Sequence, residues 1–256
     1  MEYSAVPIPA DAGDSLSLSF PGAETKSGAG TEALALLSFA SRGDMKFGDP
    51  VSKGNRDAFL RDAGIDPTAC LGLPLVHSRN VIFSSRADEV SVLASEARGA
   101  DGLILRDPGL AASVTVADCM PIWILDRDSG AFGILHSGWR GTGILARAVD
   151  ILVGRCGSRP SSIAVILGPA IGSCCYAVPE ERAAAFSSEF GTSSVALRNG
   201  SWRIDLRAAN IAIAERAGIG HLLSVEACTS CDPRLGSYRR QGAKDFTRMM
   251  AVCGHF

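Results

Sequence analysis

Residues 118–126 read DCMPIWILD and residues 135–142 read LHSGWRGT, and these two pieces decide the fold. The apolar run at 120–125 predicts a strand that is buried on both faces. The polar residues that follow predict a turn, and the next apolar run predicts a returning strand. This hairpin brings Cys119 and His136 to the same end of the two strands. We therefore expect two metal-binding side chains to lie together there.

A glycine-rich segment leads from the hairpin into a helix. Apolar residues recur at helical spacing over residues 144–152, directly after Gly141 and Thr142. The backbone N–H groups at such a helix start can bind an anion, and Arg140 adds a fixed positive charge. We therefore expect Arg140 to bind part of the substrate.

Strands and helices mix without strict alternation along the rest of the chain. This pattern predicts an α+β fold with mixed sheets, in one domain over residues 1–256. Residues 1–33 are rich in Ala, Gly, Ser and Pro, so we expect a partly loose segment with one edge strand near 16–20. We also expect a short strand at residues 73–76 that ends at His77, and an irregular loop over residues 228–242.

The composition limits the possible partners. The 256 residues are 46% hydrophobic and 20% charged with a net charge of -2, which is ordinary for a globular enzyme. The absence of a long basic run argues against nucleic-acid or membrane-surface partners. We find neither a membrane-spanning apolar stretch nor the pattern of a signal peptide, so we expect a cytoplasmic protein. The oligomeric state stays open.

His77, Cys119 and His136 are the candidate metal ligands. Three soft or borderline ligands at strand ends, with a fourth position open, are what a catalytic zinc site requires. Two alternatives remain on spacing alone. Cys119 and His136 could form a nucleophilic dyad of thiolate and base, or the three residues could be ordinary core and surface residues.

Two further cysteine pairs stand in predicted loops. Cys228 and Cys231 form a C-x-x-C motif. No second such motif follows, so loop thiols at a packed turn are favoured over a redox pair or half of a zinc knuckle. Cys174 and Cys175 follow Gly-Pro-x-x-Gly, and adjacent cysteines rarely bond each other. That loop is equally compatible with a ligand site, where glycine allows close approach, and with a buried turn.

A set of basic residues could bind an anionic substrate. Arginine binds phosphate or carboxylate through two hydrogen bonds, and Arg42, Arg140, Arg239 and Arg240 are the candidates. Tyr238 could stack on a planar base. Solvated surface charges are the alternative for each arginine taken alone.

Four motifs occur in an order that resembles the laccase-domain family, over residues 34–253. They are ADCMPI at 117–122, HSGWRGT at 136–142, GPAIGSCCY at 168–176, and CT at 228–229 with SYRR at 237–240. Members of this family have been called polyphenol oxidases and are now described as purine nucleoside phosphorylases with adenosine deaminase activity.

The resemblance implies a single domain of two mixed β-sheets packed as a sandwich with outer helices, in α/β/β/α layers. It also implies a metal ion, usually zinc, at His77, Cys119 and His136. The chain departs from the family pattern at three places. Leu75 and Ser78 flank the first histidine in place of Gln and Gly, Ala177 replaces a Glu, and the N-terminal Arg-x-Gly-Gly loop is reduced to Arg42-Gly43-Asp44.

We therefore expect a zinc enzyme that acts on purine nucleosides with phosphate. Adenosine, inosine and guanosine are the expected substrates, with methylthioadenosine as a further candidate. The residues that we expect to be catalytic are Asp118, Cys119 and Arg42. The residues that we expect to contact substrate are Arg140, Cys175, Tyr238 and Arg239.

Three other functions remain open at this point. The same site could hydrolyse an amide in a cell-wall precursor, as related peptidoglycan editing factors are described to do. Copper-dependent phenol oxidation is disfavoured, since a multicopper centre needs many imidazole ligands and the chain has 4 histidines. Copper could still occupy the single site in place of zinc. A non-enzymatic scaffold would tolerate the loss of Cys119.

Overall fold

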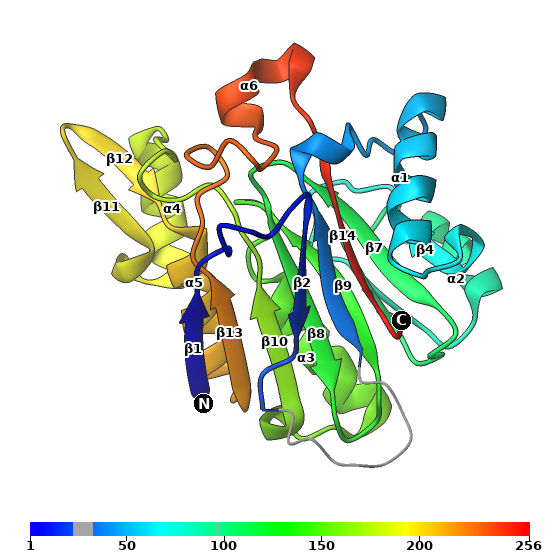
Figure 1. Cartoon of the computed structure of the whole chain (residues 1–256). Coiled ribbons are helices and arrows are strands. Elements are labelled where there is room, and N and C mark those ends of the chain that lie inside the picture. The colour runs from blue at the N-terminus through cyan, green and yellow to red at the C-terminus, as the bar shows by residue number, and fades with distance from the viewer. Residues whose placement is uncertain (23–32, 97) are drawn as a thin grey trace.

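The computed structural model describes residues 1–22, 33–96 and 98–256, and a large mixed sheet forms its centre (Figure 1). The seven strands of this sheet stand in the order β1 (Glu2–Val6), β13 (His221–Val225), β10 (Ile163–Leu167), β8 (Met120–Asp126), β9 (Phe132–Ser137), β6 (Gly102–Leu105) and β5 (Val81–Ser84). The three central pairs, from β10 to β6, are antiparallel and the pairs at both edges are parallel, so the sheet is mixed, as predicted.

A second, five-stranded sheet packs against the first. Its strands stand in the order β2 (Ser15–Ser19), β3 (Leu34–Ser38), β14 (Met249–Gly254), β7 (Ala111–Val116) and β4 (Cys70–Gly72). A separate hairpin consists of β11 (Val195–Arg198) and β12 (Ser201–Ile204).

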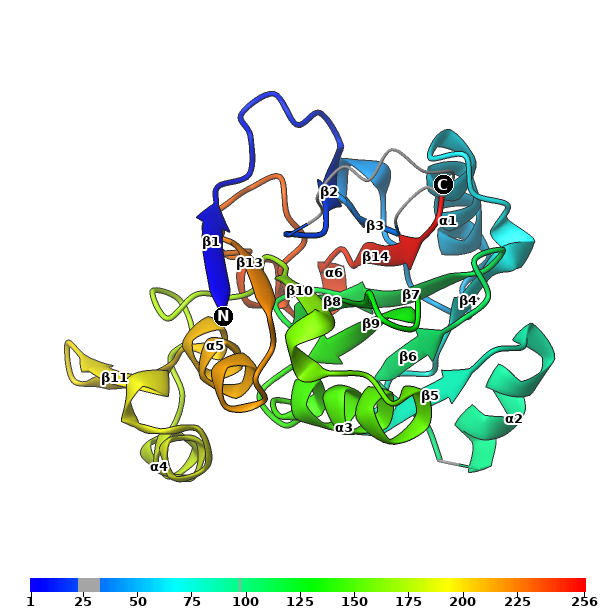
Figure 2. The same ribbon diagram turned by 90° about the horizontal axis from the view of Figure 1, so that it is seen from below.

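Helices cover the outer faces of both sheets (Figure 2). Phe59 and Leu60 of α1 (Pro50–Asp62) pack on the five-stranded sheet. The seven-stranded sheet is covered by α3 (Ile144–Cys156) and α5 (Leu206–Arg216), while α4 (Glu180–Phe190) packs against α5 and β12. Two shorter helices, α2 (Ala87–Glu96) and α6 (Tyr238–Asp245), lie at the borders. The predicted α/β/β/α layering is confirmed.

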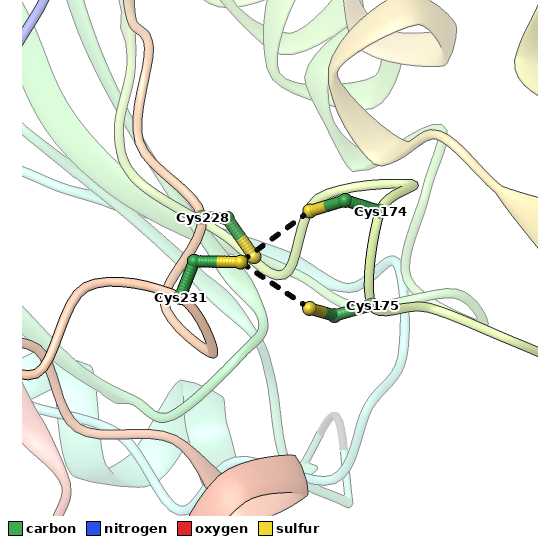
Figure 3. A group of neighbouring side chains, drawn as sticks. All are labelled: Cys174, Cys175, Cys228 and Cys231. Atoms are coloured by element: carbon green, nitrogen blue, oxygen red, sulfur yellow. Dashed lines mark hydrogen bonds between the residues drawn. The ribbon is translucent and has the colours of Figure 1, made fainter.

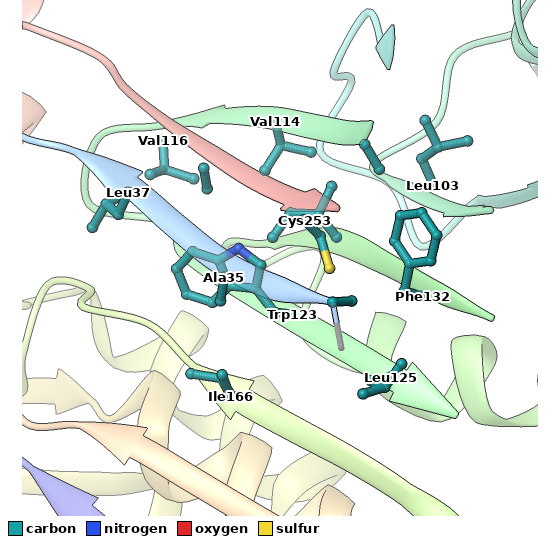
Figure 4. Packing of buried hydrophobic residues seen from close by; sticks show 14 of the residues in the cluster. Ala35, Leu37, Leu103, Val114, Val116, Trp123, Leu125, Phe132, Ile166 and Cys253 are labelled. Carbon is teal, nitrogen blue, oxygen red and sulfur yellow. The ribbon is translucent and has the colours of Figure 1, made fainter. Parts of the chain in front are cut away.

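The space between the two sheets holds the main hydrophobic core (Figure 4). Trp123 of β8 is fully buried there, and its indole N–H donates to the carbonyl of Val252 in β14 at 2.8 Å. This bond satisfies the one polar group of the side chain and joins the two sheets. Phe132 of β9 fills the same layer.

The hairpin of β8 and β9 positions the predicted metal ligands. Its register pairs Pro121 with His136, so Cys119, one residue before β8, lies at the end of β9. The turn is held by the buried carboxylate of Asp126, which accepts hydrogen bonds from three serines of nearby turns. The predicted buried hairpin is therefore confirmed.

Three local predictions are corrected. Part of the segment expected to be loose forms β1, which pairs in parallel with β13, while the expected edge strand is present as β2. Residues 23–32 of that segment lie outside the described part of the chain. Residues 73–76 form no strand, since the short strand β4 ends at Gly72, and the expected loop over 228–242 contains the start of α6.

Among the described residues, no helix combines the length and apolarity needed to cross a membrane.

Candidate metal centre and active site

Three side chains from separate parts of the chain meet at one end of the large sheet. Cys119 precedes β8, His136 lies in β9, and His77 lies in the loop between β4 and β5. Their ligand atoms all lie within 4.8 Å of one another. Two imidazole nitrogens and one thiolate form a donor set that fits zinc, and it leaves a fourth tetrahedral position for water or substrate. This group can therefore hold a metal ion.

A buried carboxylate, Asp101, orients two of the three ligands. Its Oδ1 lies 2.8 Å from Nδ1 of His136, which leaves Nε2 of that ring for a metal. The backbone N–H groups of His77 and Ser78 donate to the same carboxylate at 2.9 and 2.6 Å. The Ser78 hydroxyl adds a further bond at 2.8 Å. Asp101 therefore fixes both the imidazole ring and the loop that carries the first histidine.

The charges of the ligand group support metal binding. Burial opposes the thiolate of Cys119, but the charge of His136 and hydrogen bonds from His136 and His77 lower the pKa of Cys119 to about 6. Burial likewise opposes the charged ring of His136, but the Cys119 thiolate and Asp101 raise its pKa to about 10. A thiolate is thus formed at neutral pH, and a metal ion can take the place of the imidazolium proton.

Two residues of the site have left-handed backbone conformations that are rare outside glycine. The φ angle is 59° at His77 and 80° at Asp118. Such strain concentrates at functional sites, where surrounding contacts hold it. At Asp118 those contacts are visible, because its carboxylate accepts from the Thr229 hydroxyl at 2.7 Å and the Arg239 N–H at 2.6 Å. Both oxygens of Asp118 therefore have partners within the protein.

Glycine is needed where the helix entry passes behind the ligands. A Cβ atom at Gly138 would lie 2.7 Å from Sγ of Cys119 and 3.6 Å from a ring carbon of His77. A Cβ atom at Gly141 would lie 3.0 Å from the carbonyl oxygen of Ser78. The glycines of this motif therefore serve close packing against the ligand group.

The ligand group opens into a cavity of about 620 Å³. This volume lies within the range of about 300–1,000 Å³ that is usual for small-molecule sites. Its lining is largely apolar and aromatic, with a few charged groups. The aromatic and charged lining residues, apart from the ligand group, are Lys46, Phe47, Asp118, Trp139, Tyr176, Arg182, Tyr238, Arg239, Phe246 and Arg248.

Cations and rings lie together in this lining. The guanidinium of Arg182 lies 4.4 Å from the centre of the Trp139 ring, and Arg248 lies 4.0 Å from the Phe246 ring. Tyr238 meets Phe246 edge to face at 5.1 Å. No ion pair among the described residues involves Arg182, so this charge remains free for an anionic ligand.

The structure separates the predicted site residues into two groups. Tyr238 and Arg239 line the cavity with the metal-binding group. Cys175 lies beside it, and its carbonyl accepts from Arg239 at 2.9 Å. Arg42 lies elsewhere, where it pairs with Asp14 and Asp62, and is not a lining residue.

Two other predicted basic residues are also absent from the cavity lining. Arg140 is exposed, and its guanidinium lies 5.1 Å from the centre of the Trp139 ring. Arg240 donates to the carbonyls of Thr229 and Asp232, so it stabilises its own loop.

Sequence reasoning missed Asp101, Arg182 and Arg248. Asp101 stands alone before a short apolar strand, and its bond to His136 spans 35 residues. Arg182 lies within a helix that reads as solvated. The sequence held a signal for Asp101 alone. It is a single acidic residue directly before the buried strand β6, where a charged side chain requires a partner.

Comparison with known protein families identifies the class of protein to which this fold and this site belong. The family described as multi-copper polyphenol oxidoreductase laccase matches residues 43–255, and the chain belongs to this family. The predicted membership is therefore confirmed.

Three relatives make the similarity specific. Purine nucleoside phosphorylase YlmD from Geobacillus stearothermophilus is 32% identical over 184 residues, which cover 69% of this chain and 67% of YlmD. Its crystal structure superposes with a TM-score of 0.77 at 27% identity, over 87% of this chain and 92% of that one. Adenosine deaminase RL5 from an unidentified prokaryote is 34% identical over 154 residues, covering 57% of this chain and 59% of RL5.

Mouse purine nucleoside phosphorylase LACC1 is 32% identical over 171 residues, or 63% of this chain. The match spans 40% of the length of LACC1, so this chain corresponds to less than half of that relative.

Proposed function

We propose that the protein is a zinc-dependent purine nucleoside phosphorylase that also deaminates adenosine. The observation that carries the proposal is the group of His77, Cys119 and His136 at the wall of a cavity lined by aromatic rings and arginines. The names of the relatives, purine nucleoside phosphorylase and adenosine deaminase, support the choice of substrate. When bound at this group, zinc would supply a Lewis acid and an activated water.

The ring-lined part of the cavity suits a purine base. Trp139, Tyr176 and Tyr238 offer flat faces or edges, and stacking on such faces accepts any purine. Burial and the nearby Cys119 thiolate raise the pKa of Tyr176 to about 12, so its hydroxyl keeps its proton at neutral pH. Tyr176 would therefore donate a hydrogen bond to an acceptor nitrogen of the base.

The arginines of the cavity suit the phosphate. Arg182 would bind it most directly, because its charge is not paired with a carboxylate among the described residues. Arg239 and Arg248 would add positive potential, although each also holds neighbouring protein groups. The phosphate role that the sequence suggested for Arg42 and Arg140 therefore passes, in this proposal, to Arg182.

In phosphorolysis, a phosphate oxygen attacks C1′ of the ribose and the bond from C1′ to the base nitrogen breaks. The base takes the electron pair and a proton, and ribose 1-phosphate remains. Preorganised donors that face the developing charge lower this barrier. In deamination, a water oxygen adds to C6 of adenine and ammonia leaves. Asp118 would act by positioning Arg239, since both of its oxygens already accept hydrogen bonds.

The histidines argue against phenol oxidation at a copper cluster. His221 pairs with Glu2 at the surface, and His255 contacts the ring of Phe132. Of the four histidines, all of which lie in the described residues, His77 and His136 line the cavity. Two imidazoles and one thiolate provide a single metal position, so a redox cluster has too few ligands.

The test is to separate the products formed from adenosine, inosine, guanosine or methylthioadenosine with phosphate. We expect the free base and ribose 1-phosphate, and inosine from adenosine. His77→Ala should reduce these products to the level of buffer, while His221→Ala, which removes a surface imidazole, should retain the wild-type rate. Absence of products above the His77→Ala background would refute the proposal, and release of an amine from a cell-wall peptide instead would assign amide hydrolysis.

A further inference from the structure

Four cysteines from two loops form a compact group (Figure 3). Cys174 and Cys175 come from the loop after β10, and Cys228 and Cys231 come from the loop after β13. The four Sγ atoms point toward one another and all lie within 4.8 Å. We propose that these four thiolates bind one structural zinc ion, at a site separate from the group of His77, Cys119 and His136.

The spacing of the sulfurs fits a single tetrahedral ion. Zinc–sulfur bonds of about 2.3 Å place the sulfurs of a tetrahedron about 3.8 Å apart. Sγ of Cys231 lies 3.7 Å from that of Cys174 and 3.4 Å from that of Cys175. Small shifts therefore suffice to place all four sulfurs around one ion. An iron–sulfur cluster needs more room, because several iron atoms separate its cysteine sulfurs.

A disulfide explains the group less completely. Cys231 lies at nearly the same distance from two partners, and a disulfide would join it to one of them. Adjacent cysteines such as Cys174 and Cys175 rarely bond each other, so the remaining thiols would stay unpaired beside it. A tetrahedral ion uses all four.

The surroundings suit a thiolate centre. The N–H of Gly172 donates to Sγ of Cys228 at 3.2 Å, a bond that favours a coordinating thiolate. A Cβ atom at Gly172 would lie 3.1 Å from Sγ of Cys174, so the group depends on glycine there. Binding would release the thiol protons to solvent and leave a net charge of about -2.

Three arginines stand close to this negative charge. Arg203 donates to the carbonyls of Ser173 and Cys174, Arg239 to the carbonyl of Cys175, and Arg240 to the carbonyl of Thr229. Each guanidinium is thus fixed on the backbone of a cysteine-bearing loop. Their positive charges would offset that of a zinc tetrathiolate.

The ion would be structural, because four protein ligands leave no position for substrate. It would fasten the loop that lines one wall of the cavity to a second loop that supports this wall. The first loop carries Ile171 and Tyr176, and the second carries Thr229, whose hydroxyl holds Asp118. The cysteine group therefore acts on the candidate active site by positioning its wall.

The test is metal analysis combined with zinc-edge X-ray absorption on full-length protein, prepared with a reductant and zinc but no chelator. We expect two zinc ions per chain in the wild type. A Cys119→Ala/His136→Ala variant should keep one zinc ion with four sulfur neighbours at about 2.3 Å. A Cys174→Ser/Cys231→Ser variant should lose that ion and keep the other, while Cys156→Ser, which removes a thiol elsewhere, should keep both.

The Cys119→Ala/His136→Ala protein keeps all four cysteines of the group. The proposal can therefore be tested on this protein even if the Cys174→Ser/Cys231→Ser variant does not fold. Absence of zinc from that protein, nitrogen or oxygen neighbours around its metal, or iron in place of zinc would overturn the proposal. Intact-protein mass spectrometry that shows a disulfide among the four cysteines, in protein prepared under the same reductant, would also overturn the proposal.

Discussion

At the scale of single residues, Asp101 determines the geometry of the metal-binding group. Its side chain is fully buried, and it accepts hydrogen bonds from the backbone at His77 and Ser78 and from the ring of His136. A buried carboxylate is stable only with such partners. Sequence reasoning selected the three candidate ligands because their residue types are distinctive, but it could not find Asp101, whose partners are distant in the chain.

Replacing Asp101 with Asn should weaken both metal binding and folding. Burial alone would raise the pKa of Asp101, but hydrogen bonds from His136 and Ser78 lower it from 3.8 to about 2. A lowered pKa means that the carboxylate stabilises the fold above about pH 4 and that this contribution disappears as the pH falls toward 2. The shift corresponds to about 2 kcal/mol.

We therefore expect the free energy of unfolding of the metal-free variant to be about 2 kcal/mol lower at pH 7, with the difference shrinking on acidification. Zinc affinity should fall by about 10- to 100-fold. Urea titrations from pH 7 to 3, with the exposed Asp150→Asn as control, measure the first effect. A difference that stays constant across this range would contradict the role given to Asp101.

Replacing Gly138 with Ala should disturb the metal site directly. The new Cβ atom would lie 2.7 Å from Sγ of Cys119, so the thiolate or the helix entry must move. Gly154→Ala is the matched control, because its Cβ atom meets nothing within 4 Å on the exposed face of α3. We expect Gly154→Ala to add about 0.5–1 kcal/mol of stability. In a competition assay with a zinc chelator, Gly138→Ala should bind zinc more weakly than the wild type, and Gly154→Ala should not. Equal zinc affinity of the two variants would contradict the close packing of Gly138 against Cys119.

At the scale of elements, long patterned segments were predictable and short exposed ones were not. The hairpin of β8 and β9 and the helix α3 follow from continuous apolar runs and helical spacing. β1 reads EYSAV and is mostly exposed, so it carries no pattern of its own and exists through its pairing with β13. The start of α6 is likewise defined by the Ser237 cap on Arg240.

The cap of α5 provides a prediction at this scale. The Asp205 side chain accepts the N–H of Ala208 at 2.9 Å, and the next residue, Leu206, lines the cavity. Asp205→Ala should reduce the free energy of unfolding by about 1 kcal/mol, since a free N–H loses its acceptor. Chemical denaturation measures this loss, and Asp150→Ala on the exposed face of α3 should change stability by less than half as much. An unchanged midpoint for Asp205→Ala would exclude the cap.

At the scale of the whole molecule, residue types suggest which side chains are candidates for chemistry, but they do not show which of these side chains meet. Cys228 and Cys231 are interpreted from sequence alone as ordinary loop thiols because the cysteines that they meet lie far away along the chain. The separation between Cys174 and Cys231, for example, is 57 residues. Arg42 matched a motif but pairs with acidic residues outside the cavity. Such contacts depend on how loops from both sheets converge, which local patterns do not encode.

The layered fold explains why these loops converge. Two sheets share one core, and the loops at one end of both sheets surround the cavity, with α6 on its rim. The large sheet supplies Cys119 and His136, while the link between the sheets supplies His77. The candidate metal-binding group therefore depends on elements of both sheets.

The most direct test of the central claim is zinc titration of inosine phosphorolysis in protein stripped of metal under a reductant. We expect a negligible rate without zinc, recovery on saturation of the site formed by His77, Cys119 and His136, and no recovery in Cys119→Ser. Stripped wild-type protein that retains its full rate, or Cys119→Ser protein that recovers like the wild type, would contradict a zinc-dependent phosphorylase.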